Sequence, residues 1–187
     1  ISIFRYKIEG HEDVTKLTKL PIIADVAVAS ETAKTKAGIV VHENQNNQME
    51  EIFRSMRTNL QFMLKGNDKV IMFTSSISGE GKTFTAANLA VSFALLGKKV
   101  VLIGLDIRKP RLSELFELKD YTHGITPLLL QDDPTWEMIK EQILPSEIND
   151  NLELLLAGPI PPNPAELLTR ESLDKIINIM RDKYDFI

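Results

Sequence analysis

Cysteine is absent from this chain of 187 residues, which excludes disulfide bonds and thiolate metal sites. The chain also lacks any apolar run near the ~20 residues that a membrane-spanning helix needs. Its three histidines, His11, His42 and His123, do not have the spacing of metal ligands. Lys and Arg number 22 against 26 Asp and Glu, so the net charge is −4. We therefore expect neither a histidine metal site nor binding to nucleic acid through a basic surface.

Apolar residues make up 43% of the chain and charged residues 26%, which is ordinary for a globular protein with one sizeable core. Residues 1–46 show no strong periodicity, although residues 17–29 favour a short strand and residues 29–38 a polar loop. We expect residues 1–46 to form an N-terminal segment that packs on the core. Residues 47–187 are expected to form the main domain.

Strands and helices alternate along this main domain. Stretches with apolar residues on both faces indicate strands of a buried parallel sheet, and stretches with one apolar face indicate helices. The expected helices cover residues 47–66, 82–97, 132–143, 163–168 and 172–183, and the expected strands cover residues 69–75, 98–106 and 151–158, with a further strand beginning at residue 184. This order predicts a three-layer α/β fold with a mostly parallel sheet.

Two helix starts carry recognisable capping signals. Aspartate precedes proline at Asp133 and Pro134, which predicts a helix that begins there. Asn163 suits an N-cap, Pro164 suits a first turn, and Glu166 stands at the reciprocal capping position. Both signals support helices after residues 132 and 163.

The stretch "SISGEGKT" joins the expected strand 69–75 to the expected helix 82–97. Glycines at 79 and 81 allow backbone angles that bring several N–H groups toward one point, where they can bind phosphate oxygens. Lys82 adds a charge for the β- and γ-phosphates, and the Thr83 hydroxyl can hold Mg²⁺. We expect ATP and Mg²⁺ at this loop. The residues expected to hold the nucleotide are consecutive: Ser78, Gly79, Glu80, Gly81, Lys82, Thr83 and Phe84.

Two other interpretations of this loop exist. A strand-to-helix turn could carry a chance lysine, and a dinucleotide site could use glycines, but the G-x-G-x-x-G spacing of such a site is absent. The P-loop formula also places glycine at the position of Ser76. That position lies where the loop leaves the strand, farther from the phosphates, so the nucleotide interpretation is retained.

Asp106 follows the expected strand 98–106, and ligands of open α/β sheets bind at such strand ends. A carboxylate there can order the waters of Mg²⁺ or accept a proton from an attacking hydroxyl. The alternative is a structural role for Asp106, as an N-cap or in a salt bridge to Arg108 or Lys109.

The pair "SGEGKT" and "VVLIGLDIRKPRL" resembles the Walker A and Walker A′ motifs of bacterial tyrosine kinases, the cytoplasmic domains of capsule and exopolysaccharide co-polymerases. Three further segments agree in order along the chain. "EEIFRSMRTNL" is similar to the family's E-x-x-R-x-x-R helix, and "LLAGPIPPNPAELL" to its P-P-N-P stretch. "LTKLPIIADV" resembles the juxtamembrane segment between the second membrane span and the kinase core.

This resemblance implies a P-loop NTPase fold related to MinD and ParA, and an ATP- and Mg²⁺-dependent tyrosine kinase. Neighbouring subunits of a ring-like homo-oligomer would phosphorylate a C-terminal tyrosine cluster in each other, regulating capsule and exopolysaccharide synthesis and export. Lys82, Asp106 and Arg108 match catalytic positions, with Mg²⁺ at Thr83 and Asp106.

The resemblance also implies partners and a location. Glu51, Arg54 and Arg57 match the helix that contacts neighbouring subunits, and they lie away from the central apolar stripe of that helix, with Arg57 nearest its border. The alternative is an intrahelical ion pair. The implied partners are a membrane co-polymerase segment, in the same or a partner chain, and a cognate tyrosine phosphatase. The implied location is the cytoplasmic face of the bacterial inner membrane.

The chain departs from the family pattern in three places. Gly104 stands where the family usually has the first aspartate of D-x-D, so either Asp106 takes over as the base for tyrosine or the activity is weaker. The Walker B aspartate is expected just after Ile187, and the isolated Tyr6, Tyr121 and Tyr184 form no cluster. The chain as given is therefore expected to be catalytically incomplete, with Tyr184 in a structural role.

Two other functions remain as alternatives. A ParA/MinD-type ATPase would carry a second lysine where this chain has Ile77. A nucleotide-sensing scaffold would bind ATP and assemble through the Glu51 helix without transferring phosphate, and Gly104 would suit that role.

Overall fold

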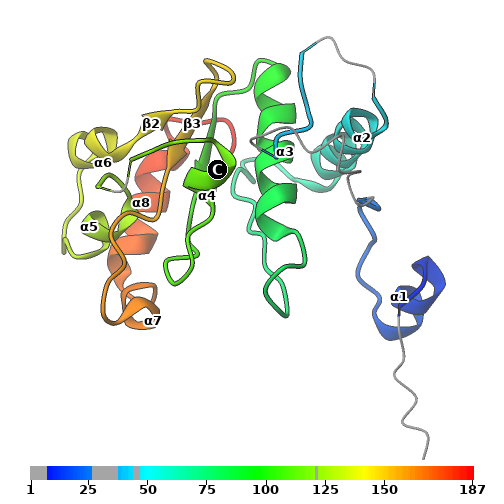
Figure 1. Ribbon diagram of the computed structural model, residues 1–187, viewed down its shortest axis with the longest axis horizontal. Helices are drawn as coiled ribbons and strands as arrows, with labels where there is room; N and C mark the ends of the chain where they lie inside the picture. The colour runs from blue at the N-terminus through cyan, green and yellow to red at the C-terminus, as the bar shows by residue number, and fades with distance from the viewer. Residues whose placement is uncertain (1–7, 27–37, 44–46, 121) are drawn as a thin grey trace, which may run out of the picture.

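A computed structural model describes residues 8–26, 38–43, 47–120 and 122–187 of the chain. Figure 1 shows helices on both sides of a small central sheet. On one side lie α2 (Gln48–Met63) and α3 (Lys82–Leu95). On the other lie α5 (Ile125–Leu129), α6 (Trp136–Gln142) and α8 (Glu171–Arg181). These three layers confirm the predicted α/β class. Three short helices complete the set: α1 (His11–Leu17), α4 (Leu112–Leu115) and α7 (Pro164–Leu167).

The sheet has the strand order β1 (Val100–Ile103), β3 (Leu152–Leu155), β2 (Leu144–Pro145). β1 and β3 pair in parallel, as predicted, whereas β2 pairs antiparallel with β3 and was not predicted. On the free edge of β1, Val100 forms a parallel bridge with Phe186. The strand expected to begin at residue 184 therefore lies beside β1.

Alternating residues of the strands face the two helical layers. Val100, Leu152 and Leu154 pack in the cluster that contains α2 and α3. Val101 and Leu155 pack in the other cluster, with α5, α6 and α8. Because a strand changes face at every residue, a sheet covered on both sides needs apolar residues at consecutive positions. The unbroken apolar runs in the sequence have this cause.

Helices α2 and α3 form where the sequence predicts them. Asn47 caps α2, since its side chain accepts a hydrogen bond from the Glu50 N–H at 2.8 Å. The C-terminal end of α3 is followed by a turn at Gly97, which has a φ of 82°. There the Lys98 N–H donates a hydrogen bond to the Phe93 carbonyl. This left-handed turn satisfies carbonyls that the helix itself leaves open.

Asn88 is a fully buried polar residue in the middle of α3. Its Oδ1 accepts hydrogen bonds from the N–H groups of Val40 (2.8 Å) and Val41 (3.3 Å). Its Nδ2 donates to the carbonyls of Gly38 (3.3 Å) and Phe84 (2.9 Å). Residues 39–41 are buried in the same core as α2 and α3, so the N-terminal segment packs on the core at this point.

The strand predicted at residues 69–75 does not form as expected. Backbone pairing is limited to the Ile71 N–H with the Ile187 carbonyl and the Ile187 N–H with the Lys69 carbonyl. Within the described residues, no backbone hydrogen bond pairs residues 72–75 with a strand. Met72 is consequently 80% exposed, against the prediction of burial on both faces.

The N-terminal prediction is also partly wrong. The expected strand 17–29 is absent in its described part: Leu17 ends helix α1, and residues 18–26 form no regular structure. This segment lies along α2, where Asn59 Nδ2 donates to the Ile23 carbonyl at 2.8 Å, so it meets a helix rather than a sheet edge. Residues 27–37, most of the predicted polar loop, lie outside the described residues.

Two helix starts need smaller corrections. Helix α6 begins at Trp136 rather than near Asp133, because the Thr135 side chain accepts a hydrogen bond from the Met138 N–H. Helix α7 begins at Pro164 after Asn163, as predicted, but no side-chain hydrogen bond caps this described turn. No helix within the described ranges is both long and apolar enough to span a bilayer.

Two glycine backbones touch where α5 begins beside the end of β3. A Cβ on Gly124 would lie 2.2 Å from the backbone nitrogen of Gly158. Gly124→Ala should therefore lower the free energy of unfolding by more than about 2 kcal/mol, because backbone atoms must move apart. Urea denaturation followed by circular dichroism measures this loss. Gly10→Ala is the control, since a Cβ there meets nothing within 4 Å; equal stability of the two variants would contradict the close contact.

Candidate phosphate-binding site

The loop of residues 76–81 leads directly into α3, whose first residue is Lys82. Gly79 and Gly81 have φ angles of 92° and 88°. Residues that carry a Cβ rarely adopt these backbone angles, so both positions favour glycine. A Cβ on either glycine would meet no atom within 4 Å, so space beside the loop is open. This open backbone suits the close approach of an anion.

The first N–H groups of α3 point out of its N-terminal end. Thr85 is the first residue whose N–H bonds within the helix, to the Gly81 carbonyl at 2.8 Å. The N–H groups of Lys82, Thr83 and Phe84 precede it and have no intrahelical acceptor. These donors and the positive end of the helix dipole form a site for an anion such as phosphate.

Lys82 and Asp106 meet at this end of α3. The Lys82 Nζ lies 3.1 Å from Asp106 Oδ2, with the two side chains 31% and 39% exposed. Asp106 follows β1, so the parallel strand brings the carboxylate to the loop as the sequence predicted. Burial alone would raise the pKa of Asp106. Hydrogen bonds from Lys82 and from the backbone of Lys109 and Arg108, with the charge of Lys82, outweigh burial and hold that pKa below its usual value.

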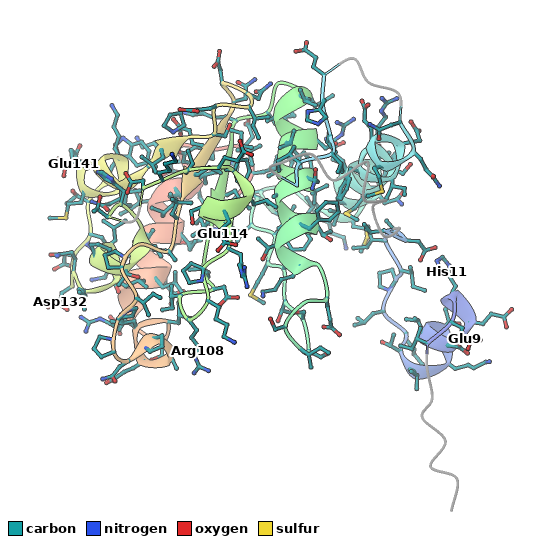
Figure 2. All side chains as sticks on the ribbon, in the orientation of Figure 1. Glu9, His11, Arg108, Glu114, Asp132 and Glu141 are labelled. Atoms are coloured by element: carbon teal, nitrogen blue, oxygen red, sulfur yellow. The ribbon has the colours of Figure 1, made fainter. Side chains whose placement is uncertain are left out.

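Asp106 also has a structural contact. Its Oδ1 accepts a hydrogen bond from the Lys109 N–H at 3.2 Å, which fixes the turn after β1. Its salt bridge is to Lys82 and not to the side chains of Arg108 or Lys109. Arg108 is exposed on that turn (Figure 2). The structure therefore joins Lys82 and Asp106 directly and leaves the Arg108 side chain toward solvent.

Lys82, Thr83 and Asp106 line a cleft of about 820 Å³. The remaining lining is mostly apolar and includes Ile71, Phe73, Leu102, Ile103, Leu112 and Leu173. Gly104 lies on the same wall. A Cβ on Gly104 would stand 3.3 Å from the Ala157 nitrogen and 3.5 Å from Leu112 Cδ2, so neighbouring atoms fill the space beside this glycine. Position 104 supplies no carboxylate, and the carboxylate that contacts Lys82 is that of Asp106.

Glu80 makes an unforeseen contact within the loop. Its Oε2 accepts hydrogen bonds from the N–H groups of Ser76 (2.8 Å) and Ile77 (3.2 Å). The sequence placed Glu80 among the nucleotide-binding residues without giving its side chain a role. Its position three and four residues after these N–H groups is the only signal for this contact.

The three α2 residues expected to contact neighbouring subunits, Glu51, Arg54 and Arg57, separate into two kinds. Arg54 is exposed and pairs with Glu50 (3.2 Å) and Glu51 (3.4 Å). Arg57 turns inward, and its Nη1 donates to the Ser92 carbonyl (2.6 Å) and to Ser92 Oγ (3.1 Å). Burial and the nearby Arg54 charge lower the pKa of Arg57. Glu51 and Arg54 are thus available on the surface, whereas Arg57 binds the end of α3.

Tyr184 is buried, and its hydroxyl donates to Glu153 Oε2. Burial and the neighbouring Glu153 carboxylate raise the pKa of Tyr184 far above the usual range. These contacts agree with the structural role predicted for it. In the residues that the structure describes, no cluster of three or more His, Asp or Glu side chains could hold a metal ion. A cation at Thr83 and Asp106 would therefore need phosphate oxygens and water as further ligands.

Comparisons with known proteins agree with this geometry. Residues 71–183 match the family described as the CobQ/CobB/MinD/ParA nucleotide binding domain. The chain is 41% identical to the tyrosine-protein kinase YwqD of Bacillus subtilis, over 73% of this chain and 56% of YwqD. It is 34% identical to the tyrosine-protein kinase CpsD of Streptococcus agalactiae, over 76% of this chain and 60% of CpsD. The chain thus spans less than two thirds of these relatives.

A solved structure shows the same arrangement. The kinase domain of the Escherichia coli tyrosine kinase ETK superposes with a TM-score of 0.83 and 25% sequence identity. The match covers 96% of this chain and 72% of the ETK domain. The P-loop NTPase architecture predicted from the sequence is therefore confirmed.

Asp106→Asn removes the ionic partner of Lys82 and should lower the free energy of unfolding by at most about 1 kcal/mol near neutral pH, because both side chains are partly exposed. The pKa of Asp106 is lower in the folded chain than in the unfolded one. Its contribution is therefore complete above the unfolded value of about 3.9 and is lost as the pH falls through the folded value. Urea midpoints of parent and variant should converge below about pH 4; a gap that widens on acidification would contradict the pairing.

Arg57→Ala should cost about 1.5–3 kcal/mol of unfolding free energy, because a partly buried charged donor is lost from the end of α3. Arg54→Ala on the same helix is the matched control, and its exposed ion pairs contribute only about 0.3–0.5 kcal/mol. Denaturant titration at a concentration where the protein is monomeric measures both. Equal losses of unfolding free energy in the two variants would show that the Arg57–Ser92 contact stabilises the fold no more than an exposed ion pair does.

Proposed function

The chain belongs to the CobQ/CobB/MinD/ParA family of nucleotide-binding domains, and we propose that it is the ATP-binding part of a bacterial protein-tyrosine kinase. The observation that carries this proposal is the Lys82–Asp106 pair, held at 3.1 Å where a glycine loop enters α3. Relatives named tyrosine-protein kinases support the choice of reaction within the family.

In this proposal, the N–H groups at the start of α3 bind the phosphates of ATP, and the loop from Ser78 to Phe84 surrounds them. Lys82 would leave Asp106 in part to neutralise the β- and γ-phosphates. The Thr83 hydroxyl and Asp106 would hold Mg²⁺, directly or through water. One or two protein oxygens with phosphate oxygens and water are sufficient, since Mg²⁺ is usually bound in this manner.

Asp106 then orients the acceptor hydroxyl and takes its proton. Its carboxylate is ionised at neutral pH, because the contacts described above keep its pKa low. Exposed Arg108 would add positive charge near the transferred phosphoryl group. Lys82, Asp106 and Arg108 are thus the proposed catalytic residues.

The acceptors we propose are tyrosines of a cluster near the kinase C-terminus, on a neighbouring subunit. Glu51 and Arg54 present exposed charges for the contact between subunits. Arg57 donates its hydrogen bond to Ser92, so it would hold α2 against α3 and would not contact the neighbouring subunit. The resulting ring would act with a membrane co-polymerase segment and a tyrosine phosphatase at the cytoplasmic face of the inner membrane, in capsule or exopolysaccharide synthesis.

One observation favours a second candidate function. The matched family includes MinD and ParA by name, and Gly104 leaves Asp106 as the carboxylate beside Lys82. A ParA/MinD-like ATPase or a nucleotide-sensing scaffold would use the same loop. Hydrolysis of ATP without phosphotyrosine would identify the ATPase, and ATP-dependent assembly with neither activity would identify the scaffold.

The test uses the full-length protein that contains this chain, incubated with ATP and Mg²⁺ and analysed for phosphotyrosine by mass spectrometry. Lys82→Ala should reduce phosphotyrosine at least about 100-fold, because charge neutralisation supplies most of the catalysis in phosphoryl transfer. Asp106→Ala should also abolish it. Lys140→Ala, an exposed lysine of α6, is the control and should retain full activity. Absence of phosphotyrosine in the parent would sink the kinase proposal.

A further inference from the structure

The phosphate loop has two sets of backbone donors. Those at the start of α3 are open, as described above. Those at the start of the loop, the N–H groups of Ser76 and Ile77, are both bound by one oxygen of Glu80, at 2.8 and 3.2 Å. A second contact lies beside them, from Ser75 Oγ to the Ile77 carbonyl at 3.0 Å. The first N–H groups of the loop therefore already bind an anion from the protein itself, the Glu80 carboxylate.

The backbone explains how Glu80 reaches these donors. Gly79 and Gly81, on either side, have left-handed φ angles that reverse the chain around Glu80. This brings a side chain of glutamate length over residues three and four positions earlier. The contact closes the loop into a ring of residues 76–80, through a side chain rather than through secondary structure.

Glu80 occupies donors that differ from those at the start of α3. The N–H groups of Lys82, Thr83 and Phe84 stay open, because Glu80 binds only the N–H groups of Ser76 and Ile77. The carboxylate therefore does not compete with a phosphate for the same hydrogen bonds. We propose that Glu80 is a positioning residue, which holds the loop in the shape that receives the phosphates. This inference rests on the proposed nucleotide site.

Glu80 holds the shape of the loop through a side-chain oxygen that accepts two hydrogen bonds, and not through its negative charge. A carboxylate near a triphosphate is electrostatically unfavourable, so its presence needs another reason. Glutamine keeps an acceptor oxygen at the same reach and removes the charge. Alanine removes both. Comparing these two substitutions separates the hydrogen bonds from the charge.

Binding of a fluorescent ATP analogue with Mg²⁺ tests this separation. Glu80→Ala should weaken binding about tenfold, since both hydrogen bonds to the side-chain oxygen are lost and the loop must be ordered on binding. Glu80→Gln should stay within about threefold of the parent. Glu141→Ala is the control, since Glu141 is an exposed glutamate on α6, far from the loop in Figure 2.

A second measurement needs no nucleotide. Amide hydrogen exchange of Ser76 and Ile77, followed by NMR, should be slower in the parent and in Glu80→Gln than in Glu80→Ala. Tighter nucleotide binding by Glu80→Ala would make Glu80 an internal competitor and overturn the proposal. Equal losses in both variants would assign the effect to charge and also overturn it. If the parent binds no nucleotide, the proposed function fails, while the exchange arm still reports on the Glu80 contact.

Discussion

Helix α3 is buried along most of its length, and every polar group that it carries into the core needs a partner inside the protein. The partners come from separate parts of the chain. Asn88 in its middle binds residues 38–41, and Arg57 and the turn at Gly97 satisfy carbonyls at its C-terminal end. Its N-terminal donors are left for an anion.

The sequence was most informative where a pattern is local. The apolar stripe of α2, the glycine at the end of α3 and the two-face runs of β1 and β3 each decide a structure from nearby residues alone. It was least informative where the structure depends on distant partners. The segment 69–75 looks like a buried strand by composition, but among the described residues its backbone pairs with Ile187, and Met72 is exposed. Strand β2 has only two residues, too few for a period-2 signal.

The site shows the same division. Gly79, Gly81, Lys82 and Thr83 were identified by spacing, and Asp106 by its place after a strand. Two contacts could not be identified in that way. Arg57 has the spacing of a surface residue, yet its long side chain passes between helices to Ser92, which is 35 residues away. Glu80 was assigned to the nucleotide site without a role for its side chain. In both cases the backbone group that the side chain binds is invisible in the sequence.

Asn88 has a consequence for where this domain begins. Its buried Oδ1 is satisfied by backbone N–H groups of Val40 and Val41, which precede the boundary at residue 47 expected from periodicity. A chain shortened to residue 47 would lose the apolar side chains of residues 39–41 and leave a buried amide without its donors. An unsatisfied buried group of this kind costs about 1–3 kcal/mol. Residues 38–41 are therefore part of the core that packs around α3.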